Sequence, residues 1–334
     1  MNWVCSLRNQ HKTFLKRIQD SKNLEYQWKE GQTMTPTNTN NTYVEKLSKV
    51  KITSADNVTV CITNHIIDVT VTRKRNTKGF SDIEKIDKDH YVVKSTGEIK
   101  EYAHVEKSQE MIASNRRKSM NKKFSYLRQY INMNFKGEEC ERHITLTYAE
   151  PTDDMAKCKN DFKKFWKRFL YRYGEMEYIA VFEPHQKGTW HIHVLVKNDS
   201  VRRLKLSKNE VEKIWGNGYI RISDFRNHND IGLYFCNLLG EDISKDKKKK
   251  SSRLEYYPLH AKIYTSSKGL AKPTLLHIDD EELKEIVGNR KPCFEQGYSI
   301  RMCDTDHEVN RIGRITYNDK INPYNEEVNR NFDS

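Results

Sequence analysis

The sequence lacks the features that would assign it to a membrane or secreted class. No apolar run approaches the ~18 residues of a membrane-spanning helix, and the first eight residues lack the apolar segment of a secretory signal. The seven cysteines are scattered without a Cys-x-x-Cys pair, so neither a disulfide framework nor a zinc–cysteine module is indicated. We therefore expect a cytoplasmic protein in a reducing compartment, with no membrane partner.

Motifs for nucleotide binding are also absent. The chain has no internal repeat, no glycine-rich dinucleotide loop and no Gly-x-x-x-x-Gly-Lys-Ser/Thr phosphate loop. Because a helicase domain needs such a phosphate loop, no fused helicase is expected.

What the chain has in excess is positive charge. Its 334 residues include 59 Lys and Arg against 46 Asp and Glu, a formal net charge of +13. This excess favours a polyanionic partner, and nucleic acid is a better candidate than an acidic membrane surface. The length allows one large domain with appendages, or two domains, with a sizeable core.

A strongly basic segment over residues 104–135 has the character of a helix. A charge run alone is most often a solvated helix face, but with this net charge a surface that binds a nucleic-acid backbone is an equal alternative. The candidate DNA-binding residues are Arg116, Arg117, Lys118, Lys122 and Lys123, together with Lys187 further along the chain.

Two histidines two positions apart are the first sign of a reactive site. Read with a period of two, their segment is a strand in which His191 and His193 share one face while Trp190 and Ile192 share the other. Since a strand rises ~3.3 Å per residue, the two histidine Cα atoms are roughly 6.6 Å apart, and both imidazoles can bind one metal ion. Alone, the pattern is weak, because short two-histidine motifs often occur by chance.

A hairpin brings a carboxylate to the histidines. Residues 178–183 form a second predicted strand, and the Pro and Gly that follow indicate a turn. In the simplest register Glu183 faces Thr189, so its side chain lies on the histidine face and diagonal to His191. His185 is interpreted as a turn residue, because the strand parity belongs to the sheet. Two imidazoles and one carboxylate suit a divalent ion that polarises a phosphate oxygen.

The elements around the hairpin follow from the same rules. Ser207 and Glu210 have the spacing of a capping box at the start of a helix. A short helix further on, ending at Gly240, places Tyr234 on or beside its buried face. Strands are expected over 58–72, 143–148, 219–222, 298–302 and 312–317, a hairpin turn at 95–97, an amphipathic helix ending at Gly174, and an acidic helix start at 279–282.

In this order the motifs resemble those of the HUH endonucleases, and more narrowly the rolling-circle replication initiator proteins of bacterial plasmids and phages. The resemblance covers roughly residues 90–275, with residues 263–273 similar to the end of such domains. The first motif is matched by Ile144-Thr145-Leu146-Thr147-Tyr148, the second by Glu183, Gly188, His191, Ile192 and His193, and the third by Ile231-Gly232-Leu233-Tyr234.

The resemblance implies an α+β fold in which a central antiparallel sheet, with a ferredoxin/RRM-like core, carries helices on one face. It predicts a nuclease domain over residues 81–275 that includes the basic region 104–135. The polar N-terminal segment, residues 1–80, is then partly flexible, and residues 276–334 form a C-terminal accessory segment.

The resemblance also implies a reaction. Tyr234 attacks a phosphodiester of single-stranded DNA at a hairpin origin, which gives a 5′-phosphotyrosine and a 3′-hydroxyl that primes rolling-circle replication, and the strand is later rejoined. Mn²⁺ or Mg²⁺ is held by His191, His193 and Glu183, and a host helicase and polymerase are partners in a bacterial cytoplasm. Because a phenol with a pKa of ~10 is a poor nucleophile at neutral pH, polarisation of the phosphate is needed.

Two departures from the family pattern bear on the mechanism. Many relatives carry Lys three or four residues after the tyrosine, where this chain has Asn237 and Leu238. Leu238 also removes the second tyrosine of two-tyrosine members, which favours a single-tyrosine mechanism.

Other interpretations stay open at this point. The chain could be an HUH transposase or a relaxase, although relaxases usually carry a longer three-histidine motif. It could also be a non-catalytic nucleic-acid-binding protein in which the histidines are structural and Tyr234 is a core residue. The rival nucleophiles are Tyr219, Tyr256, Tyr257 and Tyr264.

Overall fold

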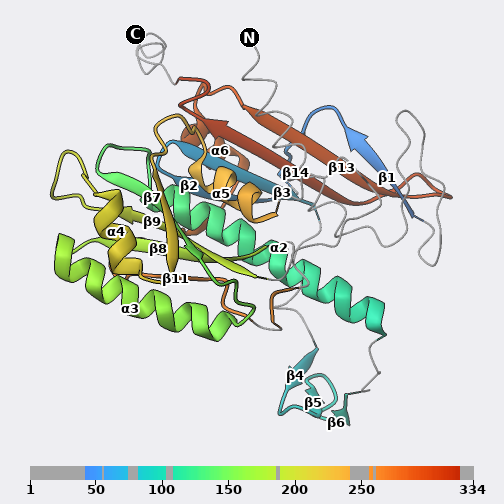
Figure 1. Cartoon of the computed structure of the whole chain (residues 1–334). Coiled ribbons are helices and arrows are strands. Elements are labelled where there is room, and N and C mark those ends of the chain that lie inside the picture. Colours follow the sequence, from blue (N-terminus) through green and yellow to red (C-terminus); the bar gives the residue numbers. More distant parts are fainter. Residues whose placement is uncertain are drawn as a thin grey trace, which may run out of the picture.

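The computed structural model describes residues 42–54, 56–73, 82–102, 108–185, 189–240, 256–258 and 261–323. Within these residues the strands form three antiparallel sheets, of five, six and three strands (Figure 1). Helices pack against the two larger sheets, so the predicted α+β class is confirmed. We call the five-stranded sheet the central sheet and the six-stranded sheet the flanking sheet.

The central sheet has the strand order of a ferredoxin-like fold. Its elements are β7 (Glu141–Tyr148), α3 (Met155–Tyr173), β8 (Glu177–Pro184), β9 (Trp190–Lys197), α4 (Lys208–Trp215), β10 (Gly218–Ser223) and β11 (Tyr264–Ser266). From β7 to β10 they follow the β-α-β-β-α-β succession of that fold. In space the order is β10-β7-β9-β8-β11, so the strand with the two histidines lies in the middle.

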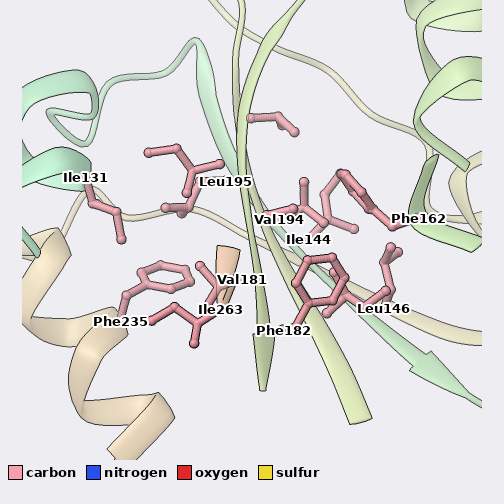
Figure 2. Packing of buried hydrophobic residues seen from close by; sticks show 14 of the residues in the cluster. Ile131, Ile144, Leu146, Phe162, Val181, Phe182, Val194, Leu195, Phe235 and Ile263 are labelled. Atoms are coloured by element: carbon pink, nitrogen blue, oxygen red, sulfur yellow. The ribbon is translucent and has the colours of Figure 1, made fainter. Parts of the chain in front are cut away.

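Strand alternation gives the central sheet two different faces (Figure 2). On one face α3 and α4 cover Phe182 and its neighbours, and the ring of Phe162 in α3 lies 6.2 Å from that of Phe182. The other face is partly covered by α2 (Gln109–Asn134) and α5 (Ile231–Gly240). Figure 2 shows Ile131 of α2 and Phe235 of α5 beside Leu195 on this second face. The histidines share the second face with Leu195.

Helix ends follow the expected cap chemistry at α3 but not at α4. The carboxylate of Asp154 accepts a hydrogen bond from the backbone N–H of Ala156 at 2.7 Å, and α3 ends at Gly174. The capping box predicted at Ser207 is wrong, because the Ser207 side chain makes no capping hydrogen bond. Glu210 instead accepts a hydrogen bond from Arg172 of α3 at 2.7 Å, so its charge joins the two helices.

The flanking sheet combines strands from before and after the central sheet. In spatial order it consists of β1 (Thr42–Leu47), β13 (Phe294–Met302), β14 (Glu308–Asn318), β3 (Ile66–Thr72), β2 (Asn57–Thr63) and β12 (Leu275–Ile278). Leu283 and Val287 of α6 (Asp280–Val287) pack in its hydrophobic core. The strands predicted over 58–72, 298–302 and 312–317 are thus confirmed. The division of the chain into three segments stays a prediction.

A small third sheet lies apart from these two sheets (Figure 1). It consists of β4 (Ile83–Lys85), β5 (His90–Val93) and β6 (Ile99–Glu101). The hairpin turn predicted at 95–97 joins β5 to β6, and Gly97 there has φ +73°, which glycine adopts readily. Across the described residues, no helix combines the length and apolar character that crossing a membrane requires.

A buried ion cluster joins the flanking sheet to α2 and α5. The guanidinium of Arg128 in α2 donates to Asp68 of β3 at 2.9 Å and to Asp230, just before α5, at 2.7 Å. Burial disfavours these charges, but the attraction of Asp230 and Asp68 outweighs it and holds the pKa of Arg128 above its usual value. Likewise, burial would raise the pKa of Asp230, but Arg128 holds it below its usual value.

We expect Arg128→Leu to lower the free energy of unfolding by about 3–5 kcal/mol, because two carboxylates then lose their buried counterion. Urea denaturation followed by circular dichroism measures the change. The matched control is Arg117→Leu in the same helix, which removes an exposed charge and should stay within about 0.5 kcal/mol of wild type. Equal effects of the two substitutions would show that the ion cluster does not support the fold.

Candidate functional site

The histidine face is assembled by three neighbouring strands. β8 and β9 pair Glu183 directly with His191, and β7 and β9 pair Thr147 with His191 and Thr145 with His193. Residues directly opposite each other in an antiparallel pair point to the same face. Glu183, His191 and His193 are therefore brought together, as the sequence predicted.

The predicted register of the hairpin is wrong by two residues. Thr189 lies opposite His185 rather than Glu183, and the His185 N–H donates to the Thr189 carbonyl at 2.5 Å. This pairing leaves a shorter loop and moves Glu183 from a diagonal position to one directly opposite His191. A shift of two residues preserves strand parity, which is why the predicted face is still correct.

His193 lies at the centre of a chain of polar contacts. Its Nε2 is 2.5 Å from Oε2 of Glu183, and its Nδ1 is 3.0 Å from Nε2 of His143. All three side chains are buried. Nδ1 of His143 lies 3.3 Å from Oγ of Ser223 on β10. Burial first, and then the nearby positive charges, hold the pKa of His143 well below its usual value, so this histidine is neutral at pH 7.

His191 has a more open environment than His193. It is half-buried, and its Nδ1 lies 3.5 Å from the hydroxyl of Thr147. The ring of the exposed His185 stacks on it with the centroids 5.6 Å apart. His185, interpreted from sequence as a turn residue, therefore borders the site.

The donor types at this site suit a divalent cation, although the side chains do not surround one. Two imidazoles and a carboxylate share one face, and such a mixed nitrogen and oxygen set suits Mn²⁺ and, less strongly, Mg²⁺. Among the described residues, no three His, Cys, Asp or Glu side chains are arranged as a metal-binding cluster. Instead the Glu183 carboxylate contacts His193 directly. Separation of that pair would make both groups available as ligands.

The start of α5 is fixed by polar contacts to α2. Asp230 accepts a hydrogen bond from the Leu233 N–H at 2.7 Å, and the Gly232 N–H donates to Oδ1 of Asn132 in α2 at 2.7 Å. A Cβ on Gly232 would lie 2.2 Å from the Arg128 carbonyl oxygen, so only glycine permits this close approach of the two helices.

Tyr234 lies on α5 beside the histidine face. Its ring is half-buried and stacks on that of His228 with the centroids 3.9 Å apart. The next residue, Phe235, packs its ring 4.7 Å from that of His143 and 6.2 Å from that of His193. The helix that carries the candidate nucleophile thus contacts the candidate site directly. Burial lowers the pKa of His228.

The rival tyrosines differ in their environments. Tyr257 is buried and its hydroxyl donates to the Phe182 carbonyl at 2.8 Å, which is a structural role. Tyr264 is half-buried against Tyr130, and burial raises the pKa of its phenol. Tyr219 on β10 is 67% exposed. Tyr256 is also exposed.

The basic residues of α2 fall into two groups. Arg116 donates to the Tyr257 carbonyl and Lys123 to the Ala261 carbonyl, so both bind the backbone before β11. The other three, Arg117, Lys118 and Lys122, are exposed and stay candidate DNA-binding residues. Lys187 lies outside the described residues.

Residues 141–242 match a family model, that of the replication-associated protein ORF2. The matched segment begins with β7 and ends just beyond α5, so it contains all three motifs and covers less than half of the chain. Neither the curated proteins nor the solved structures contain a match to the chain. The matched segment is therefore similar to replication-associated proteins in the part of the fold that carries the candidate site.

Two histidines near the site were missed by sequence reasoning. His143 shares the parity of Thr145 and Thr147 on β7, and that parity was the available signal. Its contact with His193 depends on the pairing of β7 with β9, which no local pattern gives. His228 precedes α5 and offers no local signal of its stacking on Tyr234.

The lowered pKa of His143 predicts a loss of stability in mild acid. The unfolded chain takes up a proton below a pH of about 6.5, whereas folded His143 resists it, so the free energy of unfolding falls as pH decreases from about 7.5 to about 5.5. His143→Gln keeps hydrogen-bonding groups but cannot take up that proton. We expect a smaller decline for this variant, measured by denaturant unfolding with a chelator present. Identical declines in both proteins would contradict the prediction.

Proposed function

We propose that this protein is a replication initiator that nicks single-stranded origin DNA through Tyr234 and later rejoins the strand. The observation that carries the proposal is the packing of the tyrosine helix α5 against the sheet face where Glu183, His191 and His193 meet. The similarity of residues 141–242 to replication-associated proteins supports the same role. The net charge of +13 suits a nucleic-acid substrate.

In the proposed reaction Tyr234 acts as the nucleophile. Its phenolic oxygen forms a bond to phosphorus while the bond from phosphorus to the 3′ oxygen breaks. The phenol proton passes to solvent, and the leaving 3′ oxygen takes up a proton to become a hydroxyl. The phosphodiester is exchanged rather than hydrolysed, so a 3′-hydroxyl can reverse the step and rejoin the strand.

His191, His193 and Glu183 are the residues that would hold Mn²⁺ or Mg²⁺ in this proposal. When bound, such an ion polarises the scissile phosphate and stabilises its developing charge. His143 contacts His193 Nδ1 and so fixes the ring orientation of a ligand. Because His143 is neutral, it orients that ligand without adding a second positive charge beside it.

One observation favours a second candidate, a nucleic-acid-binding protein without catalysis. The hydrogen bond between His193 and Glu183 satisfies both side chains without a metal, and the described part of the chain contains no three-residue metal cluster. In that case the histidines stabilise the sheet and the protein binds DNA without cutting it.

The nucleophile is tested with a labelled single-stranded origin oligonucleotide in Mn²⁺ or Mg²⁺. We expect wild type to form a covalent adduct that survives denaturing electrophoresis, and Tyr234→Phe to form none, because only the hydroxyl is removed. Tyr171→Phe is the matched control, since Tyr171 on α3 is 95% exposed and lies on another element. An undiminished adduct with Tyr234→Phe would exclude this residue as the nucleophile.

The metal and its ligands are tested by chelation and by His191→Ala. Both should reduce the nicking rate by at least about 100-fold, equivalent to about 2.7 kcal/mol of transition-state stabilisation. Binding of uncut DNA to His191→Ala should be retained, because the fold does not depend on this half-buried side chain. The second candidate function predicts no nicking in wild type and no change in DNA binding on chelation.

A further inference from the structure

The edge strand β10 extends the histidine face beyond the candidate site. β10 pairs with β7, which places Tyr219 opposite Thr147 and Arg221 opposite Thr145. The same threonines lie opposite His191 and His193 on β9. Two rows of side chains therefore cross the sheet on one face, Tyr219-Thr147-His191-Glu183 and Arg221-Thr145-His193.

The distances across these rows are short enough for one nucleic-acid strand. Neighbouring strands are ~4.8 Å apart, so the Cα atom of Tyr219 is roughly 10 Å from that of His191. Along β10, Tyr219 and Arg221 are separated by ~6.6 Å. The positive charge of Arg221 is one of the influences that lower the pKa of His143, so its field reaches the site.

Both β10 side chains are available to a ligand. Tyr219 is 67% exposed. Arg221 is exposed, and within the described ranges its guanidinium makes no hydrogen bond or ion pair. Nearby arginines differ, since Arg172 pairs with Glu210 and Arg226 with Asp224.

The strand itself is held from its other face. Ile220, between the two exposed residues, is buried in the hydrophobic core. An exposed aromatic ring and an unpaired cation are thus presented by a fixed strand rather than by a loop. The hydroxyl groups of Thr145 and Thr147, both half-buried, lie between this pair and the histidines.

We propose that Tyr219 and Arg221, here called the β10 surface, bind the single-stranded DNA next to the scissile phosphate. Tyr219 stacks on a base, and Arg221 binds a backbone phosphate. Stacking on aromatic side chains combined with positive charge along the backbone is the general mode of single-strand binding, and guanidinium groups suit phosphate oxygens. The inference rests on the proposed function, because it takes single-stranded DNA as the substrate.

Binding is measured by fluorescence anisotropy with the full-length protein, a labelled mixed-sequence single-stranded oligonucleotide and EDTA to prevent cleavage. Tyr219→Ala should weaken binding by about 5- to 150-fold, the loss expected for one stacked base, whereas Tyr219→Phe should retain it. Arg221→Ala should reduce the slope of log Kd against log salt by about 1. Tyr171→Ala and Lys164→Ala, exposed residues of α3, are the matched controls and should bind as wild type.

Three results would overturn the inference. Tyr219→Ala could bind as tightly as wild type, Tyr219→Phe could lose as much affinity as Tyr219→Ala, or the intact protein could fail to bind single-stranded DNA. A parallel nicking assay in Mn²⁺ separates this inference from the proposed function. Wild type that binds through the β10 surface but never nicks would refute only the function, and nicking with full affinity in Tyr219→Ala would refute only the β10 surface.

Discussion

The buried charge of Arg128 is the interaction on which the relation between the two large sheets depends. A guanidinium in this position is stable only while Asp68 and Asp230 accept its hydrogen bonds, because an unpaired buried charge is strongly unfavourable. Asp68 belongs to the flanking sheet and Asp230 to the start of α5, so one side chain fixes both relative to α2. The close approach at Gly232 adds a steric limit to the same junction.

One alternation pattern produces both the core and the candidate site. On β9, Ile192 and Val194 pack under α3 and α4, while His191 and His193 face the other way. α5 covers part of that second face with Phe235, which removes water from around His193 but leaves His191 half-buried. The result is a graded site in which one histidine is held by buried partners and the other is accessible to a ligand.

Local patterns in the sequence predicted faces and element types but not the pairings that depend on distant residues. Parity correctly placed Glu183 with the histidines, although the loop length was misjudged and the register moved by two residues. The capping box at Ser207 failed because Glu210 had a stronger charged partner in Arg172. His143 and the Arg128 cluster could not be predicted, since their contacts join elements far apart in the chain, and no periodicity encodes which strands become neighbours.

The mixed origin of the flanking sheet has a consequence for the growing chain. Asp68, which holds Arg128, also accepts a hydrogen bond from Thr316 of β14 at 2.8 Å, and β14 is translated well after α5. A nascent or proteolytically shortened polypeptide that ends before β14 therefore contains every motif residue, yet lacks the strand that supports the junction at the tyrosine helix. Correct placement of that helix becomes a property of the finished protein, which limits DNA breakage by incomplete chains.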